Sequence, residues 1–179
     1  MAEKSIFREF IAALRKRWKE QVQFIQPLTE ARGHLPKAST FYAGSIPRSS
    51  QHVFFYFQHS NKAWHVGRFT INVVLAADAN NPRMASGTRT GSDFSDGYYR
   101  IGFLVGKKDK WWHLKADKVS ILTEAWRPSS YDDSQVVLRE AVSDVTQDVL
   151  LAMRLLGVAE SHKPEAESGG VANPAPPHR

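Results

Sequence analysis

The segments QHVFFYFQH at 51–59 and RFTINVVLA at 68–76 decide the fold of this 179-residue chain. Apolar and polar side chains alternate along 68–76, which is typical of a strand with one buried face. Aromatic side chains occupy both faces of 51–59, which indicates a strand covered on both sides. Residues 60–62 (Ser-Asn-Lys) read as a turn. The two segments therefore predict neighbouring strands at the centre of a sheet.

Shorter strands are expected on either side of this pair. Residues 40–42 form a short candidate strand. Residues 98–105 and 110–114 predict a hairpin that turns through Gly106-Lys107-Lys108-Asp109. Residues 119–126 fit a strand or a helix, because their alternation is imperfect.

A helix is expected at each end of this β-rich block. Over 4–25, apolar residues recur at steps of three or four, and Pro27 forbids continuation. Residues 132–156 carry a second apolar stripe, with Asp132 or Asp133 as N-cap and Gly157 as a helix stop.

This order of elements predicts an α+β fold, an antiparallel sheet of about five strands with the N- and C-terminal helices packed on one face. We expect a single domain over 1–157. The residues that follow, 158–179, are rich in proline, glycine and glutamate, and we expect a disordered tail.

Composition limits the class of protein. Hydrophobic residues make up 42% and charged residues 23%, as in soluble globular domains. The absence of cysteine excludes disulfides and thiolate sites and fits a reducing compartment. No signal peptide or apolar run of about 18 residues is evident, so we expect a cytoplasmic protein that does not enter a membrane.

The net charge of +6 is unevenly distributed. Residues 100–118 carry +4, whereas the last predicted helix, 132–156, carries −3. A basic balance permits an anionic partner without naming one.

The stretch Arg100-Ile101-Gly102-Phe103-Leu104, followed by Asp109-Lys110-Trp111-Trp112-His113-Leu114, resembles a segment of the domain-of-unknown-function 4304 family. The sets Gln58-His59-Ser60 and Arg68-Phe69-Thr70-Ile71-Asn72 resemble further parts of that family's pattern, so the resemblance covers about residues 5–156. It implies a small bacterial α+β domain with no established catalytic residues.

Two segments are candidates for contact with a partner or an anion. In the loop 83–92, Arg83 and Arg89 lie among glycines that would let backbone amides converge on a phosphate or carboxylate, although a solvated loop fits as well. In the basic hairpin, an aromatic pair stands among cations, which suits nucleic-acid stacking or a protein interface. The other interpretation is that both tryptophans are structural. The hairpin residues are Arg100, Lys107, Lys108, Lys110, Trp111 and Trp112.

Catalytic and metal-binding patterns are weak. The sequence contains no His-Glu-x-x-His spacing and no Gly-x-Ser-x-Gly elbow. His52, His59, His65 and His113 could converge across the sheet, or they could be surface and core imidazoles. We assign no catalytic residue, metal or cofactor.

Three functions remain open from the sequence. The first is a non-catalytic bacterial protein that binds a protein partner, such as an accessory or immunity-type module of a toxin or defence system. The second is a nucleic-acid-binding module that uses the basic hairpin, and the third is an enzyme that acts on a small anion through the 83–92 loop. The sequence does not decide the oligomeric state.

Overall fold

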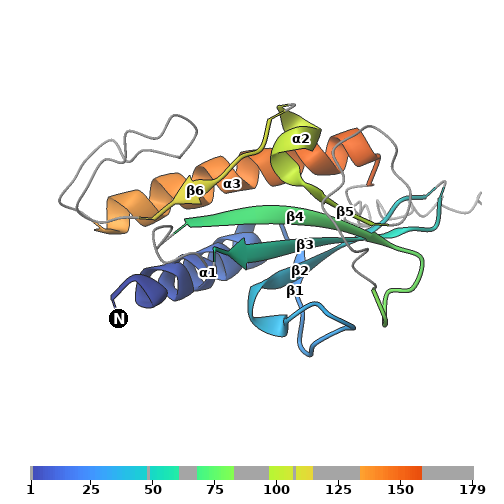
Figure 1. The fold of residues 1–179 in the computed structure, drawn as a ribbon, viewed down its shortest axis with the longest axis horizontal. Coiled ribbons are helices and arrows are strands. Elements are labelled where there is room, and N and C mark those ends of the chain that lie inside the picture. Colours follow the sequence, from blue (N-terminus) through green and yellow to red (C-terminus); the bar gives the residue numbers. More distant parts are fainter. Residues whose placement is uncertain are drawn as a thin grey trace, which may run out of the picture.

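The computed structural model describes residues 2–47, 49–60, 68–82, 97–106, 108–114 and 134–158. An antiparallel sheet has the N- and C-terminal helices on one face, which confirms the predicted α+β fold (Figure 1). In chain order the elements are α1 (Ala2–Gln21), β1 (Gln26–Pro27), η1 (Lys37–Ser39), β2 (Thr40–Ser45), β3 (His52–His59), β4 (Arg68–Ala76), β5 (Gly97–Arg100), α2 (Ile101–Val105), β6 (Trp112–His113) and α3 (Ser134–Leu156).

The sheet is ordered β1-β2-β3-β4, and β5 and β6 both pair with β4. β5 lies opposite 72–75 and β6 opposite 68–69, each antiparallel to β4. Because β3 occupies the other edge of β4, β5 and β6 share one edge and run in the same direction. They form a single edge strand that α2 interrupts.

The predicted hairpin between 98–105 and 110–114 is therefore wrong. The strand ends at Arg100, and 101–105 form α2, which packs against α3. Gly106 ends this helix, since its N–H donates to the carbonyl of Gly102 at 2.9 Å. A short apolar run fits a strand or one helical turn equally well, and tertiary packing decided between them.

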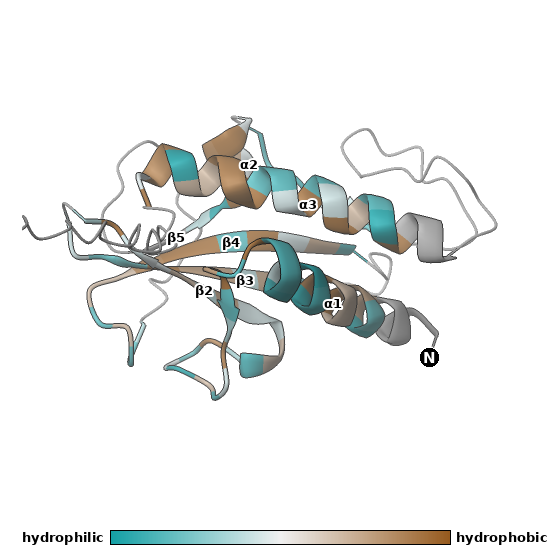
Figure 2. Ribbon diagram, turned by 180° about the vertical axis from the view of Figure 1, so that it is seen from behind, coloured by the Kyte–Doolittle hydropathy of each residue, from teal (hydrophilic) through white to brown (hydrophobic). Residues whose placement is uncertain are grey.

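The main core lies between the sheet and the two long helices. Trp18 of α1 packs edge-on against Phe41, with ring centroids 4.7 Å apart. Its indole N–H donates to the Thr146 hydroxyl of α3 at 2.9 Å, so the two helices are joined within the core. Figure 2 shows hydrophobic residues along β4 and along the side of α3 that faces the sheet.

A smaller apolar cluster covers the opposite face of the sheet, as the aromatic pattern of 51–59 predicted. It consists of Leu28, Leu35, Phe54, Val74 and Ala76, all buried. The loop that supplies Leu35 turns at Gly33, whose φ is 54°. A Cβ there would lie 2.5 Å from the carbonyl oxygen of Pro82, so only glycine lets this loop approach.

The helix ends differ slightly from the expectation. α1 ends at Gln21 rather than 25, and Pro27 forms part of the short edge strand β1, a position that tolerates proline. At the other end, Gly157 adopts a φ of 68° directly after α3, the conformation of a helix stop. Val158, the first residue of the expected tail, is buried against the core. The candidates Asp132 and Asp133, the segment 119–126 and the rest of the tail lie outside the described residues.

Gly102 is where α2 and the segment 108–110 touch. A Cβ on Gly102 would lie 2.5 Å from the amide nitrogen and 2.7 Å from the Cβ of Lys110. We expect Gly102→Ala to lower the free energy of unfolding by about 1–3 kcal/mol, because backbone rather than a flexible side chain must move. Urea unfolding of the purified protein measures this.

Gly106→Ala is the matched control. The nearest atom to a Cβ at Gly106 is 3.6 Å away, which is an ordinary contact. Equal losses in the two variants would contradict the close-approach explanation.

Candidate functional site

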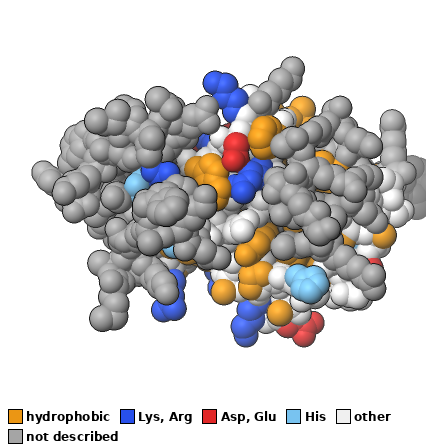
Figure 3. Space-filling model, viewed as in Figure 1, with side chains coloured by type: hydrophobic (Ala, Val, Ile, Leu, Met, Phe, Trp, Pro, Cys, Tyr) orange, Lys and Arg blue, Asp and Glu red, His pale blue; other side chains and the backbone are white. Residues whose placement is uncertain are grey.

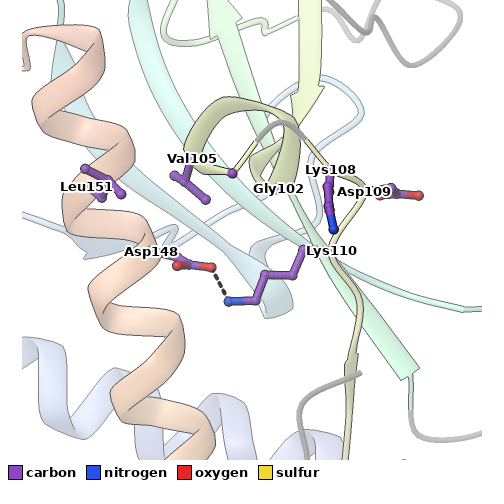
Figure 4. Close-up of a pocket in the computed structure, with 8 residues that line it drawn as sticks. Gly102, Val105, Lys108, Asp109, Lys110, Asp148 and Leu151 are labelled. Atoms are coloured by element: carbon purple, nitrogen blue, oxygen red, sulfur yellow. Dashed lines mark hydrogen bonds and ion pairs between the residues drawn. The ribbon is translucent and has the colours of Figure 1, made fainter. Parts of the chain in front are cut away.

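A pocket of about 340 Å³ opens between α2, the segment 106–110 and α3. Val105 of α2 and Leu151 of α3 face one another across it, and Lys110 extends from the strand segment toward Asp148 (Figure 4). The Asp109 carboxylate points away from α3. The pocket thus combines an apolar pair with charged groups, which is a common composition for a binding site.

The backbone of the pocket depends on Gly102. Its carbonyl oxygen accepts from the amides of Gly106 at 2.9 Å and Lys108 at 3.3 Å. These bonds fold the chain back over α2. The Lys110 carbonyl then accepts from the Thr70 hydroxyl of β4 at 2.9 Å, which attaches the returning chain to the sheet.

Lys110 bridges the strand segment and α3. Its Nζ lies 2.7 Å from Asp148 Oδ2 and 3.3 Å from Asp144 Oδ2. The Asp144 carboxylate also accepts from the Trp112 indole N–H at 2.7 Å. The ammonium lies 4.9 Å from the centroid of the Trp112 ring, so the cation, the ring and two carboxylates form one network.

The pKa of Asp148 is raised above its usual value. Burial is the largest cause, and the neighbouring Asp144 adds to it, whereas the hydrogen bond and charge of Lys110 act in the opposite direction. Desolvation therefore outweighs the ion pair, and the folded chain holds this carboxylate in its charged form at some cost. A carboxylate with a raised pKa at the wall of a pocket is a feature of binding sites as well as of structural ion pairs.

The two tryptophans lie on opposite sides of the strand segment. Trp112 is fully buried and stacks on Phe69 with centroids 5.5 Å apart. Trp111 is half-buried, and its ring centroid lies 4.5 Å from Cζ of the Arg100 guanidinium. The Asp109 carboxylate contacts both of these side chains. It accepts from the Trp111 indole N–H at 3.0 Å and lies 3.5 Å from Arg100 Nε.

The structure brings five of the eight residues proposed from the sequence into this region. Arg100 and Lys110, however, are paired with carboxylates, so the basic segment does not present them as free cations. Arg83, Arg89 and Lys107 lie outside the described residues. The residues in this region are Arg100, Lys108, Lys110, Trp111 and Trp112.

Sequence reasoning missed the α3 side of the site. Asp144, Asp148, Leu151 and Leu155 follow one another at steps of four, three and four, so they lie on one stripe of the helix. The signal that could have found them is the −3 charge of 132–156 set against the +4 of 100–118.

The three candidate histidines that the structure describes do not form one cluster. His52 and His59 are at opposite ends of β3, and His52 contacts the Tyr42 hydroxyl at 3.0 Å. His59 packs against Phe7, and His113 is buried in β6. His65 lies outside the described residues. Within the described ranges, no three His, Asp or Glu side chains are placed to hold a metal ion.

No family model, curated protein or solved structure matches the chain. The resemblance to the domain-of-unknown-function 4304 family therefore stays a prediction. Among the helices of the described segments, none is long and apolar enough to cross a membrane.

Asp148→Asn tests the cost of the buried carboxylate. With a folded pKa above the unfolded one, lowering the pH protonates the folded chain first and stabilises it. The stability of the wild type relative to Asp148→Asn should therefore be greatest at acidic pH and should fall as pH rises through the folded pKa. Urea unfolding of both proteins between about pH 4 and pH 7 measures the difference.

Asp78→Asn controls for the loss of one negative charge, because Asp78 is exposed and the Asn80 amide can also donate to the side-chain oxygen of an asparagine. A wild-type advantage that grows with pH for position 148 would contradict the assignment.

Proposed function

We propose that the chain is a non-catalytic protein that binds a protein partner at the α2–α3 surface. This surface consists of the pocket, whose wall includes the half-buried Val105, and four exposed side chains: Lys108, Leu151, Arg154 and Leu155. The partner segment that fits it is amphipathic, with apolar side chains flanked by carboxylates.

Exposed leucines beside the pocket carry this proposal. Leu155 is 55% exposed and Leu151 is 37% exposed. Within the described residues they are the large hydrophobic side chains that remain exposed, and they are one turn apart on α3. An apolar anchor from a partner could enter the pocket between Val105 and Leu151 while a second side chain covers Leu155.

The charge around this surface favours an acidic partner. Lys108 and Arg154 are exposed, and neither forms an ion pair within the described part of the chain. The carboxylates of Asp109, Asp144 and Asp148 are already engaged by Arg100 and Lys110, and these three anions are outnumbered by the four cations Arg100, Lys108, Lys110 and Arg154. The charge left to complement is therefore positive. Figure 3 shows this face of the molecule, where hydrophobic side chains lie beside charged ones.

The pairing of Arg100 and Lys110 also supports a protein partner over nucleic acid. Phosphate binding uses cations that can exchange small counterions for phosphates. Each of these two cations would first have to leave a carboxylate partner, which lowers the gain from a phosphate contact.

Site-directed crosslinking in the native host cells, where the partner is present, tests the proposal. A photoreactive benzoylphenylalanine in place of Leu155 should link one partner protein in good yield. The linked peptide should contain Asp or Glu next to Leu, Ile, Phe or Met. The same amino acid in place of Ala12, an exposed residue of α1, should not give this product.

Paired substitutions then measure the contribution of each feature. With the partner purified, Leu151→Ser with Leu155→Ser should weaken binding at least about tenfold, whereas Ala12→Ser should leave it unchanged. Lys108→Glu should weaken binding more at low salt than at high salt, and Lys16→Glu on α1 is its control. No crosslinked protein, or unchanged affinity in the double variant, would refute the proposed surface.

A further inference from the structure

The side of α1 that is turned away from the core carries a stripe of cations. Arg8, Arg15 and Lys19 follow one another at steps of seven and four, so they lie on one side of the helix. Arg8 and Lys19 are exposed, and Arg15 is half-buried. Glu9 and Glu20 are eleven positions apart, which is about three helical turns, so they share a different stripe.

Arg15 attaches the short helix η1 to this stripe. Its Nη2 donates to the backbone carbonyls of Lys37 and Ala38 at 2.9 and 3.0 Å. The exposed Lys37 therefore lies beside α1 and adds a fourth cation. We call Arg8, Arg15, Lys19 and Lys37 the α1 basic face.

The charge of the α1 basic face is not neutralised within the described part of the chain. None of its four cations forms an ion pair there, and the carbonyl oxygens that Arg15 contacts carry no formal charge. Arg100 and Lys110, in contrast, are paired with carboxylates. A surface with four uncompensated positive charges complements a polyanion.

The α1 basic face offers charge without apolar surface. In the segments that the structure describes, the exposed large hydrophobic side chains are Leu151 and Leu155 of α3, and the apolar stripe of α1 is buried in the main core. Helices that bind a membrane insert apolar side chains into it, and proteins that bind single strands stack the bases on aromatic rings. The phosphate backbone of a duplex requires neither, because cations alone can bind it.

We propose that the α1 basic face binds the phosphate backbone of double-stranded DNA without reading its sequence. Arg8 and Lys19 are separated by about 16 Å along the helix, because each residue rises about 1.5 Å. This length matches the axial rise of about five phosphates of one DNA strand, which are about 3.4 Å apart. Cations without hydroxyl or amide groups suit phosphates rather than the 2′-hydroxyls that distinguish RNA.

The inference goes beyond the proposed partner surface and does not rest on it, because the two surfaces share no residue. Lys108 and Arg154 of that surface are also exposed and form no ion pair within the described segments. They are therefore the matched control for an effect of net charge alone.

Fluorescence anisotropy with the full chain and a labelled DNA duplex of about 20 base pairs tests the proposal. We expect a micromolar dissociation constant at about 50 mM salt. The slope of log affinity against log salt should be about −3, since three to four phosphates are contacted. A duplex of unrelated sequence should bind within about twofold, because backbone contacts carry no sequence information.

Two double variants locate the contact. Arg8→Gln with Lys19→Gln should weaken binding at least about tenfold at low salt and should reduce the slope by about 2. Lys108→Gln with Arg154→Gln removes the same charge and should change the affinity less than about threefold.

Equal losses in the two double variants would mean that net charge alone attracts DNA, and this would overturn the proposal. No binding to the duplex at low salt would also overturn it. Tighter binding to phosphatidylserine vesicles or to polyglutamate than to the duplex would assign the α1 basic face to another polyanion and would overturn it as well.

Discussion

The attachment of the sheet edge to α3 depends on two contacts of the Trp112 indole. Its ring is stacked on Phe69 in the core, and its N–H is bonded to Asp144 of α3. One side chain thus joins the edge of the sheet to the C-terminal helix. With that edge held, Lys110 reaches Asp144 and Asp148, and the pocket between α2 and α3 acquires its shape.

The long elements of this fold could be predicted from the sequence because their periodicity extends over many residues. The pattern of 51–59 and 68–76 indicates the central strands, and both long helices follow from their apolar stripes. α2 could not be predicted in this way. It has five residues, too few for a periodic pattern, and its packing against α3 decides that the chain is helical there.

Only part of the candidate site could be predicted from the sequence. The charges of 100–118 and 132–156 indicate a basic segment and an acidic helix, but sequence alone does not tell whether the two meet. In the fold, Lys110 pairs with Asp144 and Asp148 of α3, so part of the apparent polarity becomes internal pairing. What is left at the surface is the exposed pair Leu151 and Leu155 with cations beside it, a pattern that depends on the packing of α3.

The interrupted edge strand also limits how this sheet can associate with other chains. A continuous edge presents a row of backbone N–H and C=O groups on which another strand can extend a sheet, and this is a route to aggregation. Here β5 has four residues, β6 has two, and a helix lies between them. Within the described residues, such an edge is a poor template for strand addition, because neither short strand offers a long row of backbone groups to an incoming chain.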